Sequence, residues 1–344
     1  MKLVSFATSH EPERLGFFLN GAIIDVEKAA KKLGLTFPST MGEFLKGEDR
    51  LMEVAHKIHA KISEDEKFGA KVDNTILLAP VPHPTSCRDA YAFRQHVATA
   101  RRNRGLEMIP EFDQFPVFYF TNHHGIVGPG DVVVESDHLQ QLDFELEAAI
   151  VIGKHGKNID AAEADAYIAG LMIMNDLSAR VLQMDEMKLS LGPAKGKDFA
   201  TAIGPWLVTL DELQSHRIAT AFGNTYDLQM TAYHNGQQVS GGNLRQMNWT
   251  FAEIIERASY GVDLFPGDVI GSGTVGTGCY LELNGTAALE AKSQGRSFTP
   301  TWLKAGDTIE LEIAGLGRLS NKIVKSSQER SILAKKKQVA VHSS

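Results

Sequence analysis

Three carboxylates alternate along residues 142–153, which read LDFELEAAIVIG. On a β-strand every second side chain shares a face, so Asp143, Glu145 and Glu147 would line one side. The apolar run after Glu147 predicts that this strand enters a protein core. Buried acids need partners, and a divalent cation can serve several of them at once. A solvent-facing acidic strand is the alternative for these residues taken alone.

Other residues that could do chemistry lie in two further stretches. Asp176 directly follows an apolar run, and if a helix starts just after it, Asp176, Arg180 and Gln183 share one helix face. An ordinary helix N-cap is the alternative for Asp176. Asp89 and His96 are seven residues apart, which is two turns of a helix on one face. A packed or surface histidine is the alternative for His96.

The elements that would position these residues are mostly strands with scattered helices. A turn ending in Gly-Asp, followed by β-formers, recurs at 128–134, 265–271 and 304–313. Such turn–strand units favour a coiled sheet or β-roll over alternating βαβ units. The glycine-rich stretch 271–278 fits neither a P-loop nor a dinucleotide fingerprint, so we interpret it as a loop whose backbone approaches a ligand. A flexible turn is the alternative.

The N-terminal part has a different pattern, and a proline-rich segment at 79–86 follows it. Short strands are expected at 2–8, 15–18 and 22–25, with a hairpin turn at Asn20-Gly21. Helices are expected at 26–34 and 41–69. The predicted domains are a small N-terminal α+β domain (1–78), a larger domain (79–325) and a polar C-terminal tail (326–344), solvated or flexible, with a lysine run at 335–337.

Composition limits the classes of partner. The net charge of −7 does not favour nucleic acid or an anionic membrane surface. Two cysteines are too few for a disulfide scaffold, so a reducing, cytoplasmic location is expected. The N-terminus does not read as a signal peptide, and we find no apolar window of 18 residues, so no membrane association is predicted.

From about Asp89 to Val324 the sequence resembles the fumarylacetoacetate hydrolase family, and within it most the fumarylacetoacetases. The resemblance rests on motifs in order and at family spacing: DAYAFRQH at 89–96, DFELE at 143–147, NDLSARVLQ at 175–183, GKDF at 196–199, FPGDVIGSGT at 265–274 and GCYLEL at 278–283. It implies a mixed α/β, strand-rich fold with a β-roll catalytic domain, and a homodimer.

The resemblance also implies roles for individual residues. The metal ligands would be Asp89, Glu145, Glu147 and Asp176, with Thr201 near the metal. The catalytic residues would be His96 as general base, Glu282 as its orienting carboxylate, and Lys197. The substrate contacts would be Tyr91, Tyr119, Arg180, Gln183 and Thr274. Asp143 would then make a supporting or capping contact.

The chemistry of these residue types agrees with a hydrolase. Four carboxylates without a Cys or His ligand suit Mg²⁺ or Ca²⁺, with Mn²⁺ as a further option. The cation would act as a Lewis acid on a diketo acid, while His96 activates water and Lys197 and Gln183 stabilise the departing enolate. The expected reaction is C–C cleavage of fumarylacetoacetate to fumarate and acetoacetate, a step of tyrosine and phenylalanine catabolism.

Two departures from the family pattern bear on the substrate. The loop between Gln183 and Lys197 is one residue longer than in the fumarylacetoacetase pattern, and Gly105 stands where the family has an arginine. Arginines 101, 102 and 104 could replace it as a clamp for a carboxylate, or they form a solvated helix face.

Three alternatives to fumarylacetoacetate hydrolysis stay open. The same metal site could serve a fumarylpyruvate or acylpyruvate hydrolase, or a decarboxylase or isomerase of a dicarbonyl acid. His96 with Glu282 favours water activation over decarboxylation. A non-catalytic, metal-stabilised binding protein is the third alternative, and the joint presence of His96, Glu282 and Lys197 argues against it.

Overall fold

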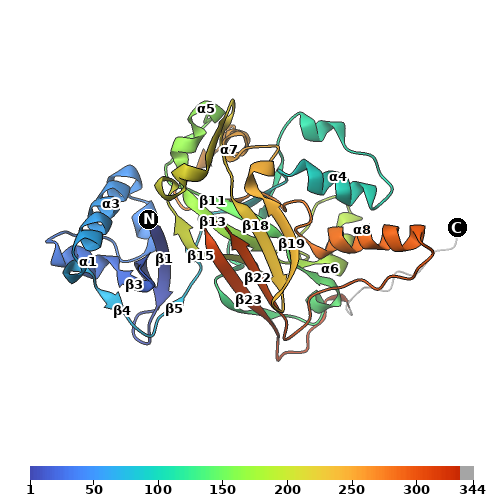
Figure 1. The fold of residues 1–344 in the computed structure, drawn as a ribbon, viewed down its shortest axis with the longest axis horizontal. Coiled ribbons are helices and arrows are strands. Elements are labelled where there is room, and N and C mark those ends of the chain that lie inside the picture. The colour runs from blue at the N-terminus through green and yellow to red at the C-terminus, as the bar shows by residue number, and fades with distance from the viewer. Residues whose placement is uncertain (334–344) are drawn as a thin grey trace.

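The computed structural model describes residues 1–333, which form two large sheets with helices around them (Figure 1). The larger sheet has twelve strands, ten of them in the order β4-β3-β2-β1-β15-β13-β11-β21-β6-β7, while β5 pairs with β1 and β8 with β15. These strands are β1 (Lys2–Ala7), β2 (Arg14–Leu19), β3 (Ala22–Asp25), β4 (Lys71–Val72), β5 (Ile76–Leu77), β6 (Cys87–Ala90), β7 (Phe118–Thr121), β8 (Ile126–Val127), β11 (Leu146–Ile152), β13 (Ile168–Asp176), β15 (Thr201–Val208) and β21 (Val269–Gly271).

The second sheet has five strands in the order β19-β18-β22-β23-β9. They are β9 (Gly130–Val134), β18 (Gln229–His234), β19 (Gln237–Asn243), β22 (Thr308–Ile313) and β23 (Gly317–Lys325). Three short pairs complete the strands: β10 (Leu142–Asp143) with β14 (Ser178–Ala179), β12 (Gly156–Lys157) with β20 (Asp263–Leu264), and β16 (Arg217–Thr220) with β17 (Gly223–Tyr226). The recurring Gly-Asp turns do lead into β9, β21 and β22, as predicted.

Strand β11 explains why the sequence after Glu147 is apolar on both sides. Its even-numbered residues pack into a core shared with the five-stranded sheet, while Ala149 and Val151 pack into a second core that includes the N-terminal helices. A central strand covered on both faces reads as a continuous apolar run. The predicted mixed α/β, strand-rich fold is confirmed.

Most of the α-helices lie toward the two ends of the molecule (Figure 1). Helices α1 (Val26–Lys32), α2 (Met41–Leu45) and α3 (Glu48–Glu64) belong to the N-terminal part, whereas α4 (Arg94–Arg102), α6 (Arg180–Met187) and α8 (Tyr280–Ser293) lie at the other end. The remaining α-helices among the described residues, α5 (Ala161–Ala164) and α7 (Phe251–Ser259), lie together between these ends (Figure 1). None of the helices among the described residues is both long and apolar enough to cross a membrane.

The N-terminal strands and the first helix lie close to the expected positions, whereas the expected helix 41–69 is divided into α2, α3 and a short 3₁₀ helix (Glu66–Phe68). The hairpin turn has φ values of +50° at Asn20 and +76° at Gly21, as a tight two-residue turn requires. Strand β1 pairs antiparallel with β15, so the N-terminal strands extend the sheet that carries the candidate site. The predicted boundary after residue 78 therefore crosses a continuous sheet, and the division into domains stays a prediction. The lysine run at 335–337 lies outside the described residues.

One local expectation is wrong and another holds in part. Asp89 is on strand β6, paired with β21 and β7, so it shares no helix face with His96 on α4. Pairing with these strands overrides the local helical pattern, because the partners are invisible in the nearby sequence. Asp176 ends strand β13, as the apolar run before it indicated, but helix α6 begins only at Arg180 and not just after Asp176.

Candidate metal centre and catalytic dyad

Carboxylates from three separate segments meet at the middle of the large sheet. One oxygen from each of Asp89, Glu145 and Glu147 lies within 4.8 Å of the others, and all three residues are buried. The acids do not share one strand as expected, because β10 ends at Asp143 and β11 begins at Leu146. Glu145 lies in this break, where its backbone N–H donates to the Asn175 side chain at 3.0 Å.

A glycine makes room for the cluster. Gly271 on β21 lies between β6 and β11, opposite Asp89 on one side and Ala149 on the other. A Cβ atom at position 271 would come within 2.6 Å of Asp89 Oδ1. The backbone N–H of Gly273 donates to both Asp89 and Glu147 at 3.1 Å. The glycine-rich loop thus brings its backbone close to the carboxylates, and its run of glycines was the signal visible in the sequence.

Two buried, positively charged side chains, Lys197 and Arg180, bind the other side of the cluster. Lys197 Nζ donates to Glu145, and to Asp176 Oδ2 at 2.7 Å. Arg180 donates to Asp143 and to Glu145, each at 2.8 Å. These contacts bring Asp176 to the same centre as Glu145, although it comes from a different strand.

The pKa values divide the acids into two groups. Burial and the Asp176 carboxylate raise the pKa of Asp89 well above its usual range, and burial and Asp89 do the same to the pKa of Glu147. Burial also acts to raise the pKa of Glu145, but Lys197 and Arg180 outweigh it and lower that pKa to about 2.

These features fit a divalent cation. Asp89 and Glu147 cannot both be charged at low cost without one, and Asp176 Oδ1 is buried with no hydrogen-bond partner. All the atoms that could bind the ion are oxygens, which suits a hard ion such as Mg²⁺ or Ca²⁺. The residues that would hold the ion are Asp89, Glu145, Glu147 and Asp176, as the resemblance implies.

A histidine–glutamate pair forms the second part of the site. His96 Nδ1 lies 2.6 Å from Glu282 Oε2, and both side chains are buried. His96 is on α4 and Glu282 on α8, and the Asn103 side chain donates to the backbone oxygen of Glu282 at 3.0 Å. The two helices cross so closely that a Cβ atom on Gly285 would lie 2.6 Å from Asn103. The dyad is therefore held by the contact between α4 and α8.

Asp143 links this dyad to the acid cluster. Its carboxylate accepts hydrogen bonds from the backbone N–H groups of Tyr280 at 2.7 Å and Leu281 at 2.9 Å, which are the first two residues of α8. The same carboxylate accepts from Arg180, which also binds Glu145. The expected supporting or capping contact of Asp143 is therefore present.

The remaining residues singled out from the sequence lie close to this network. Tyr119 donates to Asp176 at 2.5 Å, and Thr274 donates to Glu147 at 3.3 Å. Gln183 accepts from Arg180 at 2.9 Å, and Tyr91 lies edge-on to the His96 ring, with centroids 5.9 Å apart. Thr201 is buried on β15, opposite Asp176 in the sheet register. Their contacts with substrate stay predictions.

The arginines near Gly105 favour the solvated alternative. Arg102 and Arg104 are exposed, and Arg101 and Arg104 donate to backbone oxygens of their own segment. A further residue that the sequence did not reveal is Glu186, whose carboxylate accepts from the backbone N–H groups of residues 194, 195 and 196, directly before Lys197.

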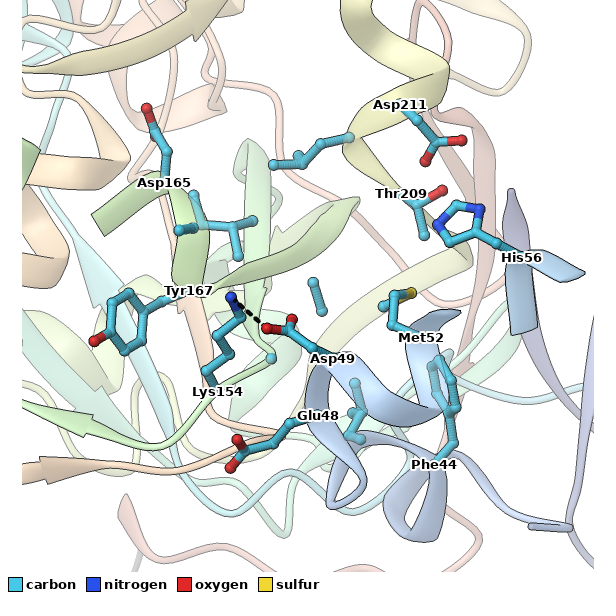
Figure 2. A pocket seen from close by; sticks show the side chains of 16 residues that line it. Phe44, Glu48, Asp49, Met52, His56, Lys154, Asp165, Tyr167, Thr209 and Asp211 are labelled. Carbon is cyan, nitrogen blue, oxygen red and sulfur yellow. Dashed lines mark ion pairs between the residues drawn. The ribbon is translucent and has the colours of Figure 1, made fainter. Parts of the chain in front are cut away.

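Two of the cavities found among residues 1–333 lie at different ends of the central strands. One of about 430 Å³ is lined by Tyr119, Asn122 and Lys197 and adjoins the acid cluster. Another of about 310 Å³ lies between the N-terminal helices and the large domain, where Phe44, Met52 and His56 face Lys154 and Tyr167 (Figure 2). Lys154 and Asp49 form an ion pair of 2.7 Å across it. Only the first cavity touches residues of the candidate site.

Comparisons with known proteins agree with this geometry. A family profile described as "Fumarylacetoacetate (FAA) hydrolase C-terminal" matches residues 85–324. The chain is 29% identical over 333 residues to the mitochondrial oxaloacetate tautomerase Fahd2a of Rattus norvegicus, covering 94% of this chain and 92% of that protein. It is 29% identical over 314 residues to oxaloacetate tautomerase YisK of Bacillus subtilis, covering 88% and 92%.

A solved structure shows the same fold. Fumarylacetoacetate hydrolase from the psychrophile Exiguobacterium antarcticum superposes with a TM-score of 0.65 at 24% identity, covering 95% of this chain and 100% of that one. At this identity the likeness shows the fold alone.

The expected reaction, hydrolysis of fumarylacetoacetate, is wrong. Relatives that align over nearly the whole chain are named oxaloacetate tautomerases, which supports the isomerase alternative instead. The assignment to tyrosine and phenylalanine catabolism has no support either. The physical reason is that a buried base can serve either to activate water or to remove a proton, and a cation stabilises the enolate that each reaction produces. The family itself is clear: the chain belongs to the fumarylacetoacetate hydrolase family, whose members are enzymes that use divalent cations.

Proposed function

We propose that this protein is an isomerase that interconverts the keto and enol forms of a short 2-oxo dicarboxylic acid, with oxaloacetate as the first candidate. The observation that carries the proposal is the pairing of an all-oxygen acid cluster with the buried His96–Glu282 dyad. The names of the rat and Bacillus relatives support the choice of substrate. We propose Mg²⁺ or Ca²⁺ as the ion, with Mn²⁺ as a further option.

His96 would move the proton. When Nδ1 donates to Glu282, Nε2 of the ring is left as an acceptor. It can take a proton from the carbon next to the 2-oxo group, and the same proton is then delivered to the 2-oxo oxygen, so atoms and charge balance. A bound divalent cation would supply Lewis-acid polarisation of the carbonyl group.

Lys197 would bind the developing enolate oxygen. Its ammonium has three N–H donors, and two of them serve Glu145 and Asp176. Lys197 also lines the cavity beside the acid cluster, so its third donor can reach a substrate oxygen there. Fixed positive charge next to a forming negative charge lowers the barrier without reorganisation.

The test is enzyme-catalysed equilibration of freshly dissolved oxaloacetate, followed by the ultraviolet absorbance of the enol. With Mg²⁺, the wild-type protein should reach the keto–enol equilibrium faster than buffer alone, without loss of oxaloacetate. An equilibration rate equal to that of buffer containing Mg²⁺ would overturn the proposal.

Hydrolysis of an acylpyruvate is the second candidate, because a buried His–Glu dyad can also activate water. Product analysis separates the reactions: tautomerisation conserves the substrate, hydrolysis yields two acids and decarboxylation releases CO₂. The homodimer and the cytoplasmic location stay predictions, and so does the lack of nucleic-acid and membrane partners. The rat relative is named as mitochondrial.

A further inference from the structure

The His96–Glu282 dyad and Cys279 form a second group of potential metal ligands. His96, Cys279 and Glu282 each offer one ligand atom, these atoms lie within 4.8 Å of one another, and all three residues are buried. The set differs in kind from the acid cluster, because it combines nitrogen, sulfur and oxygen. None of the proposed steps of tautomerisation uses Cys279.

Two helices hold this group in place before any metal binds. Cys279 is the N-cap residue of α8, and Glu282 follows in the first turn of the same helix. His96 comes from α4, which Asn103 ties to α8 through Glu282 O at 3.0 Å and Thr286 Oγ1 at 3.2 Å. Preorganised ligands lose little conformational entropy on binding, which favours affinity.

Two opposing effects act on the charge of the Cys279 sulfur. Cys279 lies at the N-terminus of a 14-residue helix, where the helix dipole stabilises negative charge. The nearby Arg180 is already neutralised by Asp143 and Glu145 and does not repel a cation strongly. Burial raises the pKa of the Cys279 thiol well above its usual value, so a metal must displace a proton to bind.

We propose that His96, Cys279 and Glu282 form a second metal site, distinct from the carboxylate site, that takes a thiophilic divalent cation such as Zn²⁺. One nitrogen, one sulfur and one carboxylate with a fourth position open is a ligand set that Zn²⁺ uses and that Mg²⁺ avoids. Binding there would withdraw His96 and Glu282 from proton transfer. Zn²⁺ would therefore inhibit the tautomerase activity, and this inhibition rests on the proposed function.

Cobalt reports the sulfur ligand directly. The full-length protein, saturated with Mg²⁺, is titrated with Co²⁺, and the near-ultraviolet thiolate-to-cobalt charge-transfer band is recorded for wild type, Cys279→Ser and Cys87→Ser. Cys87 is the other cysteine of the chain and is equally buried, which makes it the matched control. The band should appear in wild type and in Cys87→Ser and be absent in Cys279→Ser.

A band that persists in Cys279→Ser, or that is missing from the wild type, would overturn the site. Circular dichroism checks that each variant is folded, and Cys279→Ala serves as a second variant if serine disturbs the core. Cobalt bound only by the acid cluster has oxygen ligands and shows no such band. This measurement does not depend on activity, so it stands even if the proposed tautomerase function fails.

An inhibition assay tests whether Zn²⁺ at this second site blocks the tautomerase activity. Zn²⁺ is titrated into the oxaloacetate assay at saturating Mg²⁺, and each rate is divided by the zinc-free rate of the same variant. Cys279→Ser should need at least about 10-fold more Zn²⁺ for half-inhibition, since one of three protein ligands is lost. Equal inhibition of all variants would mean that Zn²⁺ acts at the carboxylates, which contradicts inhibition through the dyad.

Discussion

Glu147 tests the metal centre at the scale of one residue. It accepts hydrogen bonds from Gly273 and Thr274 and shares the cluster with Asp89. Glu147→Gln keeps the size of the side chain and removes a charge, so Mg²⁺ affinity should fall by about 10-fold or more, because a hard-ion site depends on charge count. Calorimetry measures the affinity. Glu290→Gln, an exposed acid near the end of α8, is the control and should bind Mg²⁺ like wild type.

His96 tests the chemistry at the same scale. His96→Gln should still bind Mg²⁺, because His96 does not belong to the carboxylate cluster. It should lower kcat by roughly 10²–10⁴-fold, the usual contribution of a general base. Glu282→Gln should lower kcat by no more than His96→Gln does. The loss of kcat in the double variant should be far smaller than the product of the two single losses, since the two side chains act as one unit. Near-wild-type kcat in His96→Gln would exclude His96 as the base.

Helix α8 tests how an element positions the dyad. Asp143 satisfies the first two N–H groups of α8 and pairs with the buried Arg180. Asp143→Ala should lower the free energy of unfolding by about 3–5 kcal/mol, because it removes one of the two carboxylates that pair with the buried Arg180 and leaves the two helix N–H groups without their acceptor. Thr250→Ala, which removes the side-chain cap of α7, should cost only about 1 kcal/mol.

Urea unfolding measures both variants. A loss in Asp143→Ala no larger than in Thr250→Ala would contradict this prediction and show that Glu145 alone is a sufficient partner for Arg180. Among folded molecules, Asp143→Ala should also lower kcat, because Glu282 lies in the first turn that Asp143 fixes.

The stability of the whole molecule should depend on metal and pH together. The folded pKa values of Asp89 and Glu147 are raised, so their contribution to stability is full below the ordinary carboxyl pKa near ~4 and is lost as pH rises through the raised values. A divalent cation removes this penalty by replacing the protons. The Tm difference between Mg²⁺ and a chelator should therefore grow from about pH 5 to about pH 8.

Mg²⁺ at about 100 times its Kd should add about 2.7 kcal/mol to the free energy of unfolding. Thermal melts at each pH, with and without the chelator, measure the difference. Glu147→Gln is the control, and its Tm difference between Mg²⁺ and chelator should be smaller than that of the wild type. A constant Tm difference across this pH range in the wild type would contradict the link between metal binding and these carboxyl groups.

Much of the site could be predicted because motif residues keep their order along the chain. Asp89, Glu145 and Glu147 do meet, and His96 does face Glu282. The reaction could not be predicted, since proton abstraction and C–C cleavage call for the same residue types around an enolate. Names of relatives, rather than any residue in the motifs, separated the two.

The sequence by itself determined the elements with strong local signals. The N-terminal hairpin, the Gly-Asp turns and the doubly buried strand β11 follow from turn chemistry and apolar patterning, which are local properties. Only the tertiary structure decided that Asp89 lies on a strand, that Gly271 makes room for its carboxylate, and that Asp143 holds α8. These depend on partners about 130 to 185 residues away, and no local pattern carries that information.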